Sequence, residues 1–163
     1  MSSPYLAQAQ INCAINEAWL KVLAEVPFAE LDADQGAFFG SIFGTLNHIL
    51  LADRIWISRI LGEPFTFNKL SDRLCGSLES LAVERKLTDE VLIDLMEGEQ
   101  NFGREIAYTN SSGAPFSQPL QQILIHLFAQ QHHHRGQISQ MCHERGIPIP
   151  DGGTIAYARK PQN

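Results

Sequence analysis

A run of polar side chains, QQHHHRGQ at residues 130–137, interrupts a segment that otherwise has the apolar spacing of a helix. The spacing of three and four residues on either side of the run passes through Gln130 and His134. Burying such groups without partners costs roughly 1–3 kcal/mol each, so something must satisfy them. Residues four apart stack on one helix face, the spacing with which a helix offers two ligands to one metal. The apolar residues that define this stripe are Leu120, Ile123, Leu124, Leu127, Ile138 and Met141.

A second candidate ligand, His48, lies far upstream between Leu46 and Ile49. A lone histidine on an apolar helix face is more often a hydrogen-bonded core residue than a ligand. The two polar positions on the other helix give His48 something to meet, and together the three side chains favour a metal-binding site between two helices.

The other histidines of the downstream helix are predicted to lie beside this site. His126 and His133 are on an adjacent stripe and reach its edge, whereas His132 projects to a different side. Arg135, on the side of His132, has two interpretations. It contacts an anionic substrate, or it packs or forms an ion pair on the surface of the bundle.

Helical periodicity extends over four segments, at about residues 3–26, 41–61, 77–99 and 118–145. The third segment has a candidate break near Leu87, where Thr88 is a candidate cap for a new start. Residues 104–119 combine alternating polarity with turn residues and predict a hairpin or an extended connection. The tail after Gly146 cannot be helical through Pro148 and Pro150 and is expected to pack as a strap along the bundle. The pattern predicts an all-α fold, an up-down four-helix bundle in a single domain at 1–163.

Composition excludes several classes of function. The chain of 163 residues has a formal net charge of -6 with scattered Lys and Arg, which argues against a nucleic-acid partner. No apolar run approaches the ~20 residues that cross a bilayer, and the N-terminus has no secretory signal pattern. Three widely separated cysteines without a CxxC motif indicate reduced thiols in a cytoplasmic protein. No glycine-rich phosphate loop and no Ser/His/Asp or Cys/His constellation is evident, so no catalytic residue can be assigned.

Two long motifs resemble the DinB/YfiT-like proteins. The first, GxxxxTLNHxLxADRxW, surrounds His48, and the second, HLFxxxxHHRGQ, surrounds His134. Tyr108-Thr109-Asn110 in the predicted hairpin and the sequence GIPIPD at 146–151 also match, so that the resemblance spans about residues 5 to 152. It implies a four-helix bundle in which three histidines hold a divalent metal, one from the second helix and an HxxxH pair from the last. It also implies a homodimer.

Carried over residue by residue, the resemblance makes His48 and His134 metal ligands and places Gln130 at the first position of the HxxxH pair. An amide oxygen coordinates more weakly than imidazole and suits harder ions. Three interpretations follow. The metal is held by His48, His134, Gln130 and waters; a nearby histidine, His126 or His133, is recruited; or the site has lost its metal and is a hydrogen-bonded polar pocket.

The leading functional prediction is a divalent-metal-dependent enzyme, with Zn, Ni, Fe or Mn as the candidate ion. Three protein ligands would leave positions open for water or a thiolate, as in catalytic centres. The resemblance implies a small-molecule substrate, with a low-molecular-weight thiol as a candidate partner, and a thiol-dependent transferase or a hydrolase as the reaction class. The alternative is a non-catalytic small-molecule-binding or stress-response protein with a degenerate metal site. Asn47, Gln137 and Asp53 are candidates to orient the ligands, with Asp53 pointing about 140° away from His48 on an ideal helix.

Overall fold

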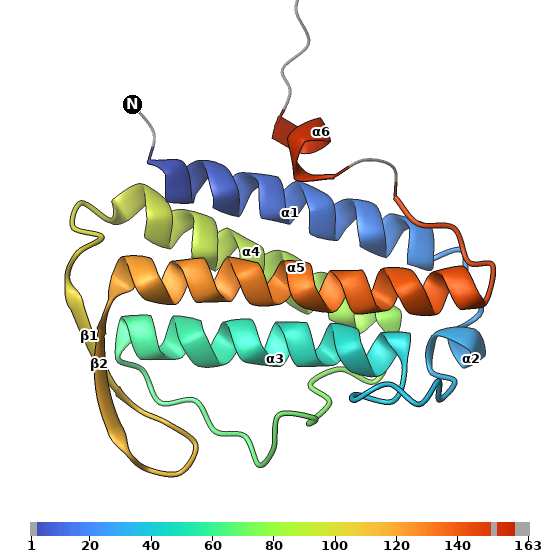
Figure 1. Cartoon of the computed structure of the whole chain (residues 1–163), viewed down its shortest axis with the longest axis horizontal. Helices are drawn as coiled ribbons and strands as arrows, with labels where there is room; N and C mark the ends of the chain where they lie inside the picture. The colour runs from blue at the N-terminus through green and yellow to red at the C-terminus, as the bar shows by residue number, and fades with distance from the viewer. Residues whose placement is uncertain (1–2, 151–152, 159–163) are drawn as a thin grey trace, which may run out of the picture.

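The computed structural model describes residues 3–150 and 153–158, and this part of the chain is mostly helical (Figure 1). Four long helices lie side by side: α1 (Pro4–Leu23), α3 (Ile42–Leu61), α4 (Leu78–Gly98) and α5 (Leu120–Glu144). A short helix, α2 (Phe28–Leu31), connects α1 to α3, and another, α6 (Thr154–Ala158), lies against α1. An antiparallel hairpin of β1 (Glu105–Thr109) and β2 (Pro115–Pro119) joins α4 to α5. The helical class and the hairpin before the last helix are as predicted, whereas α2 and α6 were not anticipated.

Serine caps set the starts of three of the long helices. The Ser3 hydroxyl accepts a hydrogen bond from the Leu6 amide, directly before Pro4, and Ser41 accepts one from the Gly44 amide. Ser77 and Ser80 form a capping box at the start of α4. At the other end of α3, Gly62 has a φ of 71° and closes the helix in the left-handed conformation. Short polar residues before apolar stripes therefore account for these boundaries.

The predicted break in the third helix is wrong, because α4 runs without interruption through Thr88. The Thr88 hydroxyl donates to the Glu84 carbonyl and accepts from Arg54 Nε, so this residue is buried in the helix interior rather than at a cap. The next residue, Asp89, is also buried. This polar pair in mid-helix resembled a boundary, although it has partners on other helices, Arg54 of α3 for Thr88 and Asn16 of α1 for Asp89.

The directions of the helices correct the predicted up-down alternation. The N-terminal ends of α3 and α4 pack in one apolar cluster with the C-terminal ends of α1 and α5, so α3 and α4 run in the same direction. The loop at residues 62–77 makes this possible by running back along the length of the helices (Figure 1). A connection of this length does not force its helices to be antiparallel, as a short one would.

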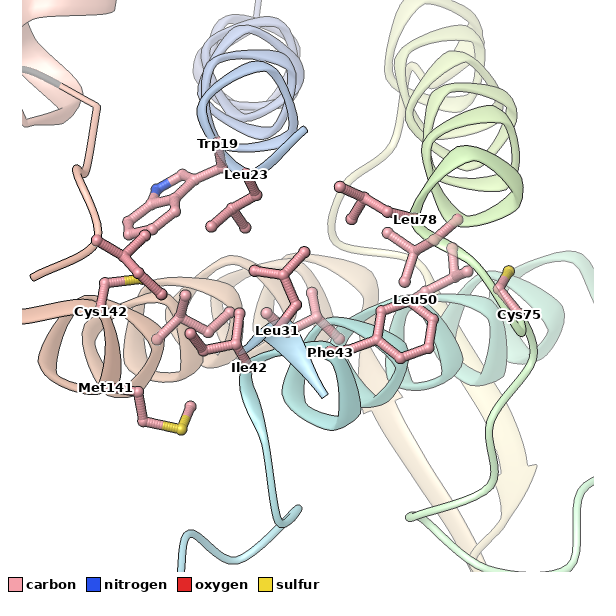
Figure 2. Packing of buried hydrophobic residues seen from close by; sticks show 14 of the residues in the cluster. Trp19, Leu23, Leu31, Ile42, Phe43, Leu50, Cys75, Leu78, Met141 and Cys142 are labelled. Carbon is pink, nitrogen blue, oxygen red and sulfur yellow. The ribbon is translucent and has the colours of Figure 1, made fainter. Parts of the chain in front are cut away.

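Two apolar clusters fill the interior, one toward each end of the four long helices. The cluster at the α2 end contains Trp19 and Leu23 of α1, Phe43 of α3 and Cys142 of α5, with Trp19 on the side of Cys142 (Figure 2). The cluster at the hairpin end contains residues from all four helices, together with Ile106 of β1. Cys75 and Cys142 are buried as small apolar residues, in keeping with the unpaired thiols predicted.

A buried polar layer separates the two clusters, and no sequence pattern had indicated it. All four helices contribute to it, two residues from each except α3, which supplies one; its members are Asn12, Asn16, Asp53, Arg85, Asp89, Gln131 and Arg135. On α3, α4 and α5, these residues fall in sequence between the members of the two clusters, whereas on α1 Asn16 follows Ile15 of the cluster at the α2 end. The layer therefore fixes the axial register of the helices through directional contacts.

The layer contains two arginines and two aspartates, so its formal charges cancel. Arg85 Nη1 donates to Asp53 Oδ2 at 2.5 Å, and Arg85 Nη2 lies 2.9 Å from Asp89 Oδ1. Arg135 Nη1 donates to the side-chain oxygens of Asn12, Asn16 and Gln131. Burial raises the pKa of Asp53 to about 6, against the opposing effect of Arg85, and lowers the pKa of Arg135 to about 10.

The C-terminal segment follows the predicted course only in part. Residues 147–150 have no regular structure, Ile147 is buried, and α6 then packs on α1. Asp151 of the GIPIPD sequence lies outside the described residues. Within the described chain, no helix is both long enough and apolar enough to cross a membrane.

We predict that Arg85→Ala lowers the free energy of unfolding at pH 7 by about 3–5 kcal/mol, because it leaves two buried carboxylates without their cation. Lys86→Ala is the matched control. Lys86 is adjacent on α4 and reaches Glu90 only at 4.0 Å on the exposed surface, so its loss should change stability by less than about 0.5 kcal/mol. Urea denaturation measures both. Equal effects of the two substitutions would show that the buried layer does not stabilise the fold.

Candidate metal centre and its pocket

His48 of α3 and His134 of α5 face each other across the helix interface. Their Nε2 atoms are 3.1 Å apart, and the ring planes are inclined at 81°. Each Nδ1 atom has its own partner: that of His48 is 2.8 Å from the Leu70 carbonyl oxygen, and that of His134 is 2.8 Å from Gln137 Oε1. A carbonyl oxygen only accepts, so both Nδ1 atoms carry the proton.

With both protons on Nδ1, the two Nε2 atoms present lone pairs to each other. Two acceptors at 3.1 Å repel unless a proton or a cation lies between them. Two imidazole nitrogens bound to one tetrahedral zinc at 2.0–2.1 Å would be about 3.3 Å apart. The observed separation therefore suits two ligands of one metal ion.

Burial lowers the pKa of both imidazoles. For His48, desolvation outweighs the hydrogen bond to the Leu70 carbonyl, which acts in the opposite direction. For His134, desolvation outweighs the hydrogen bond to Gln137. Both rings therefore favour the neutral form, which is the form that binds metal.

Phe39, in the loop before α3, covers the imidazole pair. Its ring stacks on His48 with centroids 3.7 Å apart and a tilt of 14°, and its edge meets His134 at 5.6 Å. The loop is held close to α3 at Gly44, where an added Cβ would lie only 2.1 Å from the Phe39 carbonyl oxygen. Gly40 supplies the turn between them with a φ of 80°.

The imidazole pair lies in the wall of a cavity of about 750 Å³. Aromatic side chains from four regions line it: Phe39 from the loop before α3, Trp56 from α3, Phe67 from the loop 62–77, and Tyr108 from the hairpin. Among the described residues that line it, none is an aspartate or glutamate, and Arg59 is the one with a permanent charge. The site thus combines two nitrogen ligands with a largely aromatic binding space of small-molecule size.

The chain matches the model of the DinB family over residues 1–159. It belongs to the DinB family. No curated protein is similar enough to the chain to count as a match. The resemblance drawn from the two histidine motifs is thereby confirmed at the level of the family.

Within this DinB protein, Gln130 and His134 line the cavity together, although neither lies in the interior stripe predicted for them. The positions on α5 that are fully buried are the adjacent Gln131 and Arg135, which belong to the polar layer. The buried face of α5 is wider than a stripe with a strict spacing of three and four residues. Gln130 and His134 lie on the border of this face, where the helix faces the cavity. The structure supports neither interpretation of Arg135, since this side chain is buried and does not line the cavity that contains His48 and His134; it borders only a small interior cavity of about 20 Å³.

The remaining histidines of α5 are placed as the sequence predicted. His126 and His133 are exposed and line the cavity at its edge. His132 lies on the α1 side, where its Nδ1 accepts from Arg135 and its Nε2 is 3.5 Å from Gln8 Nε2. The histidine triplet therefore contributes one residue, His134, to the facing pair.

Of the three residues considered for orienting the ligands, only Gln137 contacts one. Its Oε1 accepts from His134, and its Nε2 is 3.4 Å from His133 Nε2. Asn47 instead accepts from the Cys75 amide, and Asp53 belongs to the polar layer. The Leu70 carbonyl, which orients His48, has no side-chain signal in the sequence. Arg59, a further lining residue of the cavity, could have been found from the sequence, because it continues the helical face of His48, Ala52 and Ile55.

The donor set available to a metal falls short of three imidazoles. Among the described residues, no group of three or more His, Cys, Asp or Glu side chains is arranged to hold a metal ion. The His48 and His134 Nε2 atoms fit two positions of a metal site, and the Gln130 side chain is the candidate oxygen donor in the same cavity. A further ligand would be water, a bound small molecule, or one of His126 and His133, which line the same cavity at its edge.

We predict opposite effects for two glycine-to-alanine substitutions. Gly44→Ala should destabilise the protein by about 1–3 kcal/mol, because the new methyl group forces the Phe39 backbone away from α3. Gly136→Ala in α5, where an added Cβ meets nothing within 4 Å, should stabilise it by about 1 kcal/mol. Thermal and urea denaturation measure both. A stability gain in both variants would contradict the proposed close contact.

Proposed function

We propose that this protein is a divalent-metal-dependent enzyme in which His48 and His134 bind the ion through Nε2. The observation that carries the proposal is the pair of converging lone pairs, 3.1 Å apart, each fixed by a hydrogen bond to the opposite ring nitrogen. Gln130 supplies an oxygen ligand, and water or substrate completes the coordination. The candidate ions are Zn, Ni, Fe and Mn, and a weaker third ligand favours the harder ones.

The proposed reaction is a transfer or a hydrolysis on a small molecule. A metal with open positions supplies Lewis acidity and lowers the pKa of a bound water or thiol, so a low-molecular-weight thiol is a candidate co-substrate. The chain's own part is to hold both imidazoles neutral, to orient them through Leu70 and Gln137, and to exclude water with the Phe39 ring. The aromatic cavity holds the substrate beside the ion.

A second candidate function is non-catalytic binding of a small molecule in the same cavity. It is favoured by Gln130, where the family pattern has a histidine. It is also favoured because, among the described residues, no three His, Cys, Asp or Glu side chains are arranged to hold a metal ion, although His126 and His133 line the same cavity. In that case, a shared proton would occupy the place between the two Nε2 atoms.

We further propose one cytoplasmic domain, a four-helix bundle that functions as a homodimer. The family match over most of the chain supports a single unit. An apolar stripe on the outer face of α4 supports dimerisation: Val83, Leu87 and Val91 recur every four residues and are 59%, 50% and 41% exposed.

We predict that tag-free protein binds one zinc ion per chain, measured by titration against a chromophoric chelator. His134→Ala should weaken binding by more than about 100-fold, since even loss of an orienting residue costs 10–100-fold. His132→Ala is the matched control, because this ring faces α1, and it should bind as the native protein does. Gln130→His should bind more tightly than the native protein. Binding by Gln130→His alone, with none by the native chain, would refute the metalloenzyme proposal and favour the second function.

A further inference from the structure

Arg59 lies at the end of the cavity that is far from the imidazole pair. It follows His48 by eleven residues on the same face of α3, which is about 16 Å along the helix axis. Its guanidinium carbon is 4.5 Å from the ring centre of Trp56 and 4.8 Å from that of Tyr108. The two aromatic rings fix the position of this cation in the cavity wall.

The guanidinium has donors to spare. Its one hydrogen bond to the described chain is a long one, 3.4 Å from Nη2 to the Thr109 carbonyl oxygen. No carboxylate of the described residues forms an ion pair with it. This contrasts with Arg54, Arg73, Arg85 and Arg104, each of which pairs with an aspartate or glutamate.

The surroundings of Arg59 favour an anion. The side chain is half-buried, and desolvation lowers its pKa from the usual value, so the charge lacks part of its hydration. The cavity contains no acidic lining residue that could satisfy it. A guanidinium stacked on aromatic rings keeps its N–H edge free for a carboxylate or another planar anion.

We propose that Arg59 binds the anionic group of the substrate, and that the substrate class is a small carboxylate with a flat apolar body. This inference rests on the proposed function in one respect: the reacting end of the molecule would lie at His48 and His134. The body would lie between Trp56 and the other aromatic walls, with a span on the order of 10 Å from anion to reacting group. Arg59 would thus select the substrate and set its orientation.

The test compares 1-naphthaleneacetate with its neutral amide, 1-naphthaleneacetamide, by isothermal titration calorimetry. Protein freed of metal with a chelator is used, so that the acid cannot bind through a metal ion. The native chain should bind the acid at least about tenfold more tightly than the amide, because a charge-assisted hydrogen bond is lost in the amide. Arg59→Met should abolish this difference, and Arg59→Lys should retain part of it.

Lys86→Met is the matched control, since it makes the same change in net charge at an exposed site on α4 and should leave the preference intact. Equal binding of acid and amide by the native protein, or a preference that survives in Arg59→Met, would overturn the proposal. Tighter binding of glutathione than of 1-naphthaleneacetate would overturn the inference that the substrate has a flat apolar body. A preference that depends on Arg59 in a chain that fails to bind zinc would refute the metal centre and leave the anion site standing.

Discussion

Two imidazole nitrogens that both point a lone pair at the same space are the constraint around which the site of this DinB protein is arranged. The Leu70 carbonyl and Gln137 hold the protons on the outer nitrogens, so the inner nitrogens, 3.1 Å apart, have no proton of their own. Burial disfavours the charge that would resolve the conflict by protonation. A shared cation would satisfy both rings without charging either, and this is the basis on which we propose that the pair binds a metal ion.

The rest of the fold supports this arrangement. Because α3 and α4 run in the same direction, the loop between them must travel back along the helices, and it passes His48 on the way. The loop is fixed in turn by Asp72, which accepts from the Asn68 and Lys69 amides, and by the Arg73–Asp32 ion pair. The polar layer holds α3 and α5 in register, with Gln131 Nε2 donating to Asp53 Oδ2 one turn from the metal-site candidates. A shift of one helix by a turn, about 5.4 Å, would separate the two imidazoles.

The sequence predicted the long helices and the hairpin well, because serine caps, glycines and apolar spacing act locally. It also predicted that His48 and His134 meet across two helices, since a histidine on an apolar face needs a partner, and their Nε2 atoms are 3.1 Å apart. It failed where side chains also have partners on other helices: Thr88 and Asp89 resembled a break, and Arg135 was assigned to a substrate or to the surface rather than to the interior. Helix direction was beyond the pattern as well, because a long connection permits either orientation. The Leu70 carbonyl could not be foreseen, since every residue has one.

The most direct measurement is ¹⁵N NMR of the histidine side chains in zinc-loaded protein, which reports the protonation and ligation of each ring nitrogen. We predict that His48 and His134 are both protonated at Nδ1 and bound to zinc at Nε2, with the ring of His132 unaffected. A protonated Nε2 in either ring of the pair, or zinc bound only by other histidines, would contradict the central claim that these two nitrogens form the metal centre.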